Sequence, residues 1–330
     1  MKVLFIGGTG IISTAVSKMA ADRGMDLYLF NRGSKDISVK DIQQIKGDIN
    51  NKQEISNFLK ENHFDCVVNW INYIPEHVQR DIQLLKNKTS QYIFISSASV
   101  YQKPLLHPVI TESTPLSNPF WDYSRNKILC EEILNRAYRE EGFPMTIVRP
   151  SLTYDKVFPV AVGGWGGFTL ADRLCKGKKV IIHGDGTSLW TVTHADDFAR
   201  GFLGLIGHQQ AIGHSFHITS DEILTWDQIY RIIADSLGVI PDIIHIPSDF
   251  IYKVNPDIGV GLIGDKAYST IFDNSKIKMF VPGFRAVIPF NEGIKRTINW
   301  FNEDKKRKCV DEQVNQAMDK IIQTYEKCFI

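Results

Sequence analysis

The sequence predicts an α/β protein with a doubly wound parallel sheet and a smaller α+β unit toward the C-terminus. Two observations support this prediction. Short β-rich runs alternate with helical patterns through the first half of the chain, and a glycine-rich turn follows the first run directly. The composition is that of an ordinary globular protein, with 43% hydrophobic and 23% charged residues.

The first half should form a dinucleotide-binding domain over residues 1–155. Its expected strands are residues 3–6, 27–30, 42–46, 66–70, 92–96 and 146–148. Helical stretches lie between most of these runs, which implies right-handed crossovers and helices on both faces of the sheet.

Residues 156–330 should form mainly a substrate-binding domain and the C-terminal helices. The glycine-rich segment 163–167 is either a lid over the cleft or an ordinary loop. Residues 215–219 form a further β-rich run, so we expect segments around 187–219 to return to the first domain. An apolar stripe indicates a last helix that packs inside the chain or against a subunit, and it consists of Val310, Val314, Ala317, Ile321 and Tyr325.

Charge and cysteine usage exclude several classes of protein. The net charge is +1, from 38 basic and 37 acidic residues, which favours neither nucleic acid nor an anionic membrane as a partner. The five cysteines are scattered singly, and no histidine has ligand spacing, so we expect no disulfide and no metal. Without a signal-peptide pattern or a long apolar run, the expected location is the cytoplasm.

The turn after the first strand has the pattern of a nucleotide-binding loop. Gly7 allows a tight turn, Gly10 allows the backbone to approach a pyrophosphate, and the following helix offers amide donors to phosphate. Ser13 occupies the third glycine position, so the helix is expected to lie slightly farther from the strand. The candidate cofactor-binding residues here are Gly7, Thr9, Gly10, Ile11 and Ile12.

The end of the second strand favours NADP(H). An acidic residue there would bind the ribose hydroxyls of NAD, but the chain has Asn31 and Arg32, which can accept a 2′-phosphate. The alternative is that Arg32 is a solvated turn residue and NAD(H) binds through Asn31. Asp48, next to Ile49, either accepts a hydrogen bond from the adenine amine or caps the following helix.

A candidate acid–base pair follows in Tyr123 and Lys127, four residues apart on one helix face. A nearby ammonium should lower the pKa of the phenol and prepare it for proton transfer. Ser97 follows the strand at 92–96, where parallel sheets bind ligands, and can donate a hydrogen bond to the reacting oxygen.

With these motifs the chain resembles the extended or atypical short-chain dehydrogenase/reductases, in the group called the NAD-dependent epimerase/dehydratase family. The resemblance rests on the segments 7–10, 47–48, 97–101, 149–150, 183–187 and 194–197, together with Tyr123 and Lys127. It implies a Rossmann-type fold, a homodimer, and Ser97, Tyr123 and Lys127 as catalytic residues, with Lys127 also binding the nicotinamide ribose. It also implies that Asn69, Trp70, Ser96, Tyr123, Lys127 and Pro150 contact the cofactor.

The chain departs from the family pattern near the substrate. Ala98 and Ser99 stand where family 4,6-dehydratases carry an Asp-Glu pair, which disfavours dehydration. Trp190 stands where nucleotide-sugar enzymes commonly have a phosphate-binding Arg, and a second such Arg is not evident before Asp265. The candidate substrate contacts are Ser99, Trp121 and Trp190, with burial in the core as the alternative for Trp190.

The leading hypothesis is an NAD(P)-dependent oxidoreductase or epimerase that transfers hydride at a secondary alcohol or ketone of a sugar-like small molecule, nucleotide sugars included. The rival hypothesis is a non-catalytic NADP(H)-binding sensor or an RNA-associated member of the atypical branch. We expect His194 and Asp197 to make structural hydrogen bonds, and Asp122, next to Trp121, could cap its helix.

Overall fold

A computed structural model describes residues 1–33, 42–165 and 167–329 of the chain. A seven-stranded parallel sheet forms its centre, in the order β12-β7-β5-β4-β1-β2-β3. The strands are β1 (Lys2–Ile6), β2 (Asp26–Asn31), β3 (Ile42–Lys46), β4 (Cys66–Asn69), β5 (Tyr92–Ile95), β7 (Met145–Arg149) and β12 (Ser215–His217). The fold class predicted from the sequence is confirmed. The six strands predicted in the first half match observed ones within a residue at either end, and the later run 215–219 forms β12, which ends at His217.

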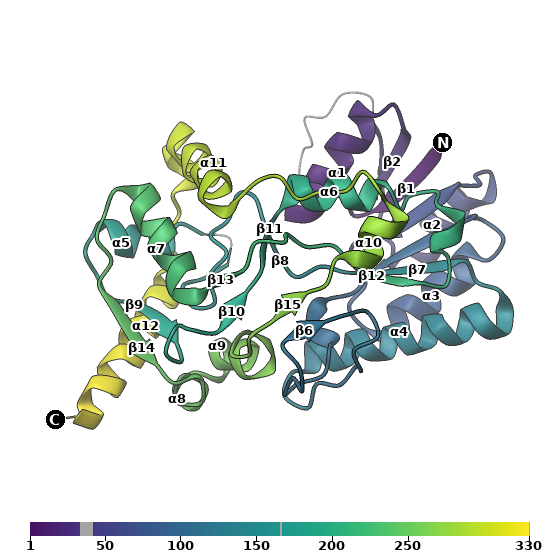
Figure 1. Ribbon diagram of the computed structural model, residues 1–330. Coiled ribbons are helices and arrows are strands. Elements are labelled where there is room, and N and C mark those ends of the chain that lie inside the picture. The colour runs from purple at the N-terminus through teal and green to yellow at the C-terminus, as the bar shows by residue number, and fades with distance from the viewer. Residues whose placement is uncertain (34–41, 166, 330) are drawn as a thin grey trace.

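Alternating side chains of the sheet pack against helices on its two faces (Figure 1). Val3 and Phe5 of β1 lie in a core with α1 (Ile11–Asp22) and α6 (Ala195–Leu203). Leu4 and Ile6 point the other way, into a core with α2 (Lys52–Lys60), α3 (Pro75–Leu85) and α4 (Asp122–Glu141). This period of two, on a sheet covered on both faces, is why the strands consist of nearly continuous apolar runs.

The strand order reverses beside β1. From β1 the sheet continues through β2 and β3 on one side and through β4, β5, β7 and β12 on the other. Helices on opposite faces leave a crevice at such a reversal, outside the carboxyl ends of the strands. Gly7 and Trp70 directly follow β1 and β4, so they lie at this crevice.

The chain leaves the sheet after β7 and builds a second group of elements, at the left of Figure 1. Its strand pairs are β8 (Leu152–Tyr154) with β11 (Val192–His194), β9 (Val180–His183) with β14 (Ile243–Ile246), and β10 (Leu189–Trp190) with β13 (Leu224–Thr225). A further pair joins β6 (Val109–Ile110), which comes before β7 in the chain, to β15 (Ile271–Phe272). Its longer helices are α7 (Trp226–Leu237), α11 (Phe290–Glu303) and α12 (Glu312–Glu326), with the shorter α5 (Thr169–Cys175), α8 (Ser248–Val254) and α9 (Pro256–Gly261). The short helix α10 (Ser275–Phe280) instead packs on the seven-stranded sheet, where Ile277 shares a core with α1 and α6.

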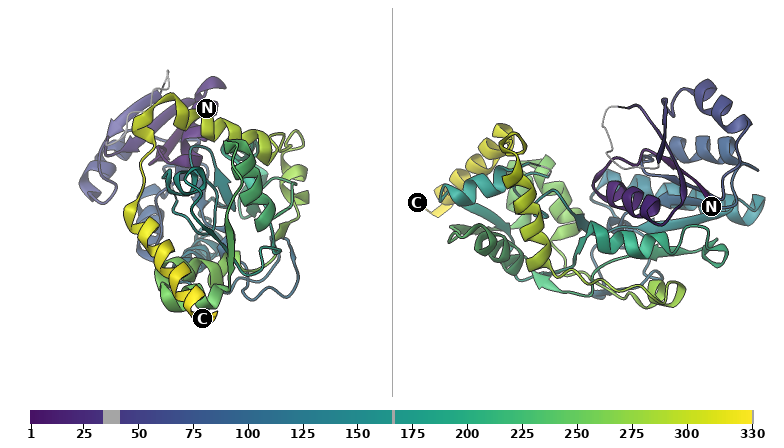
Figure 2. Two further views of the ribbon diagram at one scale, coloured as in Figure 1. Left: turned by 90° about the vertical axis from the view of Figure 1, so that its left-hand side faces the viewer. Right: turned by 90° about the horizontal axis from the view of Figure 1, so that it is seen from above.

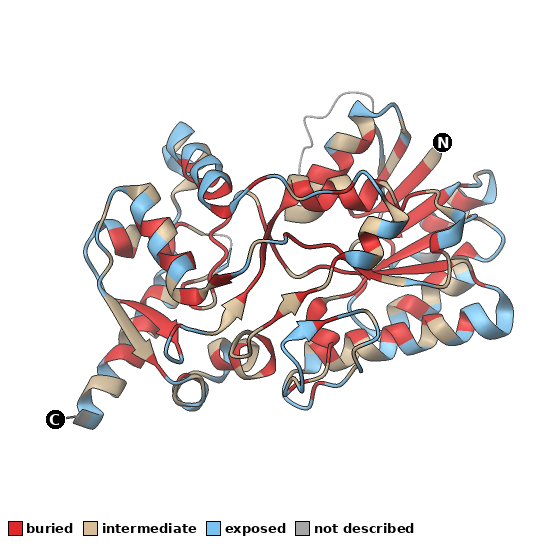
Figure 3. Cartoon of the chain, viewed as in Figure 1, coloured by how far each residue is buried: buried red, intermediate tan, exposed pale blue. Residues whose placement is uncertain are grey.

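The two groups are linked by several passages of the chain (Figure 2). β12 returns to the seven-stranded sheet and pairs with β7, while β8 and β11 lead between the groups. The division at residue 155 stays a prediction. Figure 3 shows buried residues along the strands of the sheet and exposed ones along the outer sides of the helices.

The last helix packs inside the chain, which confirms one of the two alternatives predicted from the sequence. In α12, Met318, Ile321 and Ile322 are buried, and they share a core with Ile181 of β9 and Ile251 of α8. Among the described residues, no helix is both long and apolar enough to cross a membrane.

Candidate functional site

The turn after β1 requires glycine. Gly7 and Gly8 have φ angles of +93° and +94°, which side-chain-bearing residues rarely adopt. A Cβ at Gly7 would lie 3.0 Å from Ile71, and one at Gly8 would lie 2.9 Å from Leu29. At the start of α1, Gly10 has no side chain to cap the helix, which leaves the first amides of α1 open to a phosphate.

Ser13 completes this turn. Its side chain is buried and its hydroxyl oxygen accepts a hydrogen bond of 2.8 Å from the Gly10 amide. The hydroxyl thus fills the place of the third glycine and closes the turn onto the helix.

A cavity of about 390 Å³, which we call the glycine-turn cavity, lies between the ends of β1, β2, β3 and β4. The predicted cofactor residues that line it are Gly7, Thr9, Asn31, Arg32, Asp48 and Ile49. The side-chain oxygen of Asn31 accepts a hydrogen bond of 2.8 Å from the Gly33 amide, while the buried side-chain nitrogen of Asn31 has no partner among the described residues. A buried donor without a partner is expected where a ligand supplies the acceptor.

Asp48 does not cap the following helix, so that alternative was wrong. The cap of α2 is Asn51, whose side chain accepts from the amides of Gln53 and Glu54. The Asp48 carboxylate accepts a bond of 2.9 Å from the Asn50 amide and lines the glycine-turn cavity.

A second cavity, of about 350 Å³, lies at the ends of β1, β4 and β5 and is called the Lys127 cavity. The predicted residues that line it are Gly10, Ile11, Ile12, Trp70, Ser96, Ser97, Tyr123, Lys127 and Pro150. The hydroxyls of Ser96 and Ser151 in its lining are buried and have no partner among the described residues. Together, the open helix start, the glycine turn and these unsatisfied groups fit a dinucleotide that extends across both cavities.

Lys127 lies in a cage of aromatic rings and carbonyls. Its ammonium donates to the carbonyl oxygens of Asn72 at 2.5 Å and Ile95 at 2.7 Å. The same nitrogen lies 4.8 Å from the ring centre of Tyr73 and 5.8 Å from that of Tyr123. Burial lowers the pKa of Lys127 to about 8.

The pKa of Tyr123 differs from the expectation. Burial raises it to about 12, and a hydrogen bond with the Ser97 hydroxyl opposes that rise. The expected lowering of the Tyr123 pKa by Lys127 was wrong. The ammonium is held by two backbone carbonyls, so it does not pair with the phenol oxygen, and the apolar surroundings disfavour the phenolate.

Three serine hydroxyls lie in a chain beside Tyr123. Ser124 donates to the Ser99 hydroxyl at 2.7 Å, and the hydroxyls of Ser99 and Ser97 are 2.9 Å apart. The Ser97 oxygen also accepts from the Ser99 amide at 3.2 Å. With its oxygen accepting, the Ser97 hydroxyl can turn its proton toward a substrate oxygen.

A third cavity, of about 360 Å³, shares Ser97 and Tyr123 with the Lys127 cavity. We call it the tryptophan cavity because Trp121, Trp165 and Trp190 all line it. Trp190 fits both of its predicted roles, as a core residue and as a candidate substrate contact. It is 2% exposed and its ring centre lies 5.4 Å from that of Trp226, and it also lines the tryptophan cavity. The predicted substrate residue Ser99 lines it as well.

The start of α4 and the segment 163–167 both contribute to the lining of this cavity, through Trp121 and Trp165. Asp122 is the first residue of α4 and Trp121 is its N-cap, so the capping role for Asp122 was wrong. Trp165 is 52% exposed and belongs to the predicted lid segment 163–167, of which Gly166 lies outside the described residues. Whether the segment is a lid or a loop stays a prediction.

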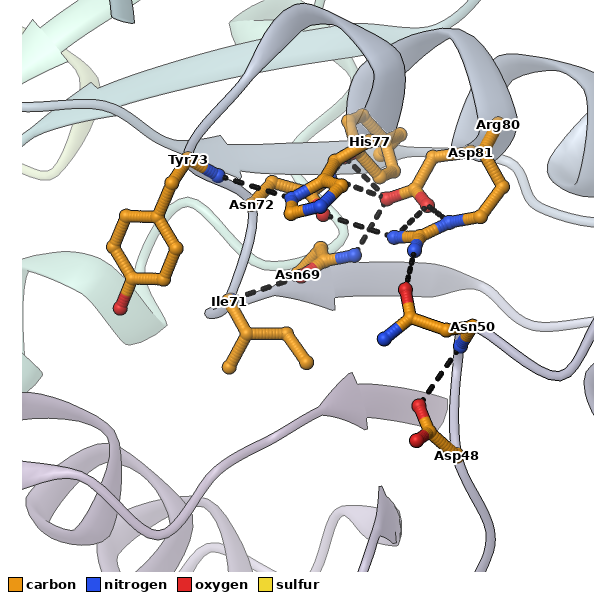
Figure 4. A network of polar contacts seen from close by, with 10 residues as sticks. Asp48, Asn50, Asn69, Ile71, Asn72, Tyr73, His77, Arg80 and Asp81 are labelled. Atoms are coloured by element: carbon orange, nitrogen blue, oxygen red, sulfur yellow. Dashed lines mark hydrogen bonds and ion pairs between the residues drawn. The ribbon is translucent and has the colours of Figure 1, made fainter. Parts of the chain in front are cut away.

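Asn69 lines none of the three cavities, and it supports them through a buried network (Figure 4). The side-chain amides of Asn69 and Asn72 each donate to Asp81 at 2.6 Å. Arg80 pairs with Asp81 at 3.0 Å and donates to the Asn50 side chain at 2.9 Å. The network therefore joins the loop at the glycine-turn cavity to Asn72, whose carbonyl holds Lys127.

His194 and Asp197 make structural hydrogen bonds, as expected. The His194 ring accepts from the Asp196 amide at 3.1 Å, which caps α6. The Asp197 carboxylate accepts from the amides of Val287 at 3.1 Å and Ile288 at 2.8 Å.

Sequence reasoning missed several lining residues. They include Ile71 and Tyr73 after β4, Ser151 and Thr153 around the start of β8, and Lys266 and Phe272. The position of Tyr73 after a central strand could have indicated it, whereas no sequence signal indicates Lys266.

Comparison with known proteins agrees with this arrangement. The chain is 26% identical over 267 residues to the chloroplast stem-loop binding protein of 41 kDa b of Arabidopsis thaliana, covering 76% of this chain and 67% of that protein. It is 31% identical over 172 residues to a UDP-glucose 4-epimerase of Lactobacillus helveticus, covering 45% of this chain and 51% of the relative. The matches thus span between half and two thirds of the length of these relatives.

Among solved structures, a UDP-glucuronic acid 4-epimerase of Bacillus cereus in complex with NAD has the same fold, with a TM-score of 0.72 at 18% identity. The superposition covers 92% of this chain and 97% of that one. The model of the NAD dependent epimerase/dehydratase family matches residues 3–219. The chain therefore belongs to the NAD dependent epimerase/dehydratase family.

Proposed function

We propose that this protein transfers hydride between a nicotinamide cofactor and a secondary alcohol or ketone of a sugar-like substrate, as a reductase or an epimerase, with Tyr123 as the acid/base. One observation carries the proposal: Ser97 and Tyr123 line both the Lys127 cavity and the tryptophan cavity. A cofactor ring in the first and a substrate in the second would meet at these two hydroxyls.

The residues suggest how a carbonyl would be reduced. The bound cofactor would supply the hydride. Ser97 donates a hydrogen bond to the carbonyl oxygen, and Tyr123, with its pKa of about 12, is protonated at neutral pH and gives its proton to the same oxygen. The reverse direction needs the phenolate, so ligands that bring positive charge to Tyr123 would favour oxidation.

Dehydration is the less favoured reaction in this proposal. Elimination of water needs an acid and a base at the substrate. Asp265 is the carboxylate among the described residues that line the tryptophan cavity, and it is paired with Lys103 at 3.4 Å. Ala98 and Ser99 offer no replacement.

We also propose a preference for NADP(H), with NAD(H) as the alternative. Arg32 lines the glycine-turn cavity and is exposed, and the unpartnered amide of Asn31 lies beside it. An arginine and a neutral hydrogen-bond donor suit a 2′-phosphate. The alternative is supported by the Bacillus cereus epimerase, whose structure is a complex with NAD.

The test combines cofactor identity with a catalytic variant. Denatured protein should release any retained nucleotide for mass spectrometry, and retained NAD(H) would favour an epimerase cycle. Tyr123→Phe should lower turnover by about 10²- to 10⁴-fold. Near-full activity in this variant would remove Tyr123 from the mechanism.

A second candidate function is RNA binding, because a stem-loop binding protein matches 76% of the chain. Binding through phosphates should weaken steeply as salt is added. An electrophoretic shift assay with a structured RNA, repeated over a salt series, measures this. No binding at low salt would eliminate this candidate.

A further inference from the structure

The tryptophan cavity has one charged patch in its wall. Asp265 and Lys266 are the charged side chains among the described residues that line it. Both belong to η3 (Leu262–Lys266), a π-helical turn that follows α9. Such turns are rare and occur frequently at functional sites.

The charges in this patch do not cancel. Lys103 has a fully buried side chain, and its ammonium lies 3.4 Å from one oxygen of Asp265. Lys266 lies 3.8 Å from the other oxygen, too far for a direct hydrogen bond. Two lysines thus share one carboxylate, and the ammonium of Lys266 keeps its donors for another acceptor.

The backbone of Lys266 is held rigidly. Its carbonyl oxygen accepts hydrogen bonds from His183 at 2.9 Å and from the indole of Trp226 at 3.1 Å. Two residues earlier in the turn, the backbone carbonyl of Gly264 accepts from the Asn118 side chain at 2.7 Å. Since these bonds use only the backbone of the turn, the side chain of Lys266 can be exchanged without breaking them.

The ammonium of Lys266 lies close to Tyr123, with the ring of Trp121 between them. Lys266 lies 5.6 Å from the ring centre of Trp121, whose ring lies 5.0 Å from that of Tyr123. The indole nitrogen of Trp190, in the same lining, is buried without a partner among the described residues. A ligand that reaches Tyr123 can therefore also reach an unused cation.

Resting on the proposed function, we propose that Lys266 binds a single carboxylate or phosphate group of the substrate, which makes the substrate a compact anionic sugar. A lysine presents a point charge, which suits one oxyanion, whereas a diphosphate is usually held by the paired donors of arginine. The described lining of the tryptophan cavity contains no arginine. The uncharged remainder of the sugar would contact the tryptophan rings.

The test is calorimetric titration of the cofactor-loaded Tyr123→Phe protein, so that binding is read without turnover. Glucose, glucose 6-phosphate, glucuronate and UDP-glucose serve as probes. Glucose 6-phosphate, glucuronate or both should bind at least tenfold more tightly than glucose. Whichever of these two probes binds more tightly shows whether Lys266 binds a phosphate or a carboxylate.

Adding Lys266→Met should then remove most of that margin, a loss of about 10- to 100-fold for the anionic probe, while glucose and cofactor affinity stay unchanged. Lys176→Met is the matched control, because Lys176 is an exposed lysine that lines none of the three cavities.

Three results would overturn the inference: equal binding of neutral and anionic sugars, a margin that survives Lys266→Met, or no binding of either anionic sugar. Tightest binding of UDP-glucose, unaffected by Lys266→Met, would also overturn it in favour of a nucleotide sugar. Failure of hydride transfer is read separately, from the activity of the unsubstituted protein against Tyr123→Phe.

Discussion

The glycine-turn cavity and the tryptophan cavity are built in opposite ways. The first is formed by short stretches at the ends of β1, β2, β3 and β4, so its shape is set by the backbone at four neighbouring strand ends. The second gathers side chains from at least five separate segments, among them Ser99, Trp121, Trp190 and Lys266. The cofactor half of the cleft is thus a property of local geometry, and the substrate half is a property of tertiary packing.

The comparison predicts the largest effect for a backbone change in the cofactor half. Gly7→Ala should weaken cofactor binding by about 10- to 100-fold, since strain of about 1–3 kcal/mol must displace the turn. The new Cβ would also lie 3.0 Å from Ile71. Fluorescence titration with NADPH and NADH measures the affinity.

Gly24→Ala is the matched control. Gly24 also has a positive φ of +71°, but a Cβ there would meet nothing within 4 Å. It should lower the free energy of unfolding by about 1 kcal/mol and leave cofactor affinity intact. Equal losses of affinity in both variants would show that global stability, and not the turn, determines binding.

A second prediction concerns Lys127, where the two halves meet. As pH rises through its pKa of about 8, Lys127 loses its charge. In the direction of reduction, kcat/KM should be constant below that pH and fall by up to about tenfold per pH unit above it, because kcat/KM reports groups of the free enzyme. Tyr123, with a pKa of about 12, stays protonated through this range.

Cofactor affinity over the same pH range is the control for this profile. If cofactor affinity stays unchanged while kcat/KM falls, the loss of charge on Lys127 affects proton or hydride transfer and not cofactor binding. A profile with no break near pH 8 would show that the charge of Lys127 is not needed.

The third prediction separates the two cofactors. Arg32→Ala should weaken NADPH binding by about tenfold through the loss of a charge-assisted hydrogen bond, and NADH binding should stay unchanged. Arg23→Ala, which removes an exposed arginine outside the three cavities, is the control. Equal weakening of both cofactors would mean that Arg32 does not contact a 2′-phosphate.

The same contrast explains what the sequence could predict. The strands were predictable because β4 and β5 are short apolar runs buried on both faces. Many of the predicted cofactor residues follow such strands within three positions, so finding a strand also locates the residues at its end; Thr9, Asp48, Trp70, Ser96 and Pro150 are examples. Asn69 is the predicted cofactor residue that lines none of the three cavities, since its side chain turns back to Asp81 and to the Ile71 amide, and its contact with the cofactor stays a prediction.

The substrate half could be predicted only in part. Ser97, Ser99 and Trp121 lie next to recognisable motifs, whereas Lys266 and Phe272 are placed by contacts with distant segments such as His183 and β6. Nothing in their local sequence determines those contacts. The raised pKa of Tyr123 was equally hidden, because it depends on burial that the Tyr-Lys spacing does not reveal.

The smallest predicted effect concerns buried hydroxyls, which contribute either to ligand binding or to the stability of the fold. Ser151 lines both the Lys127 and the tryptophan cavity, and its buried hydroxyl has no partner among the described residues. Ser151→Ala should therefore change the free energy of unfolding by less than about 0.5 kcal/mol while weakening cofactor or substrate binding about 3- to 10-fold. Thermal unfolding and titration measure the two quantities.

Thr146 provides the opposite case. It is buried away from the three cavities, and its hydroxyl donates to the Ala211 carbonyl at 3.0 Å and accepts from Gln91 at 3.1 Å. Thr146→Val should cost about 1–3 kcal/mol of stability, because Gln91 loses a partner in a buried place, and should leave ligand affinity unchanged. If Ser151→Ala destabilised the protein as much as Thr146→Val, the Ser151 hydroxyl would belong to the folding interactions, and the unsatisfied groups around the cleft would lose their value as markers of ligand contact.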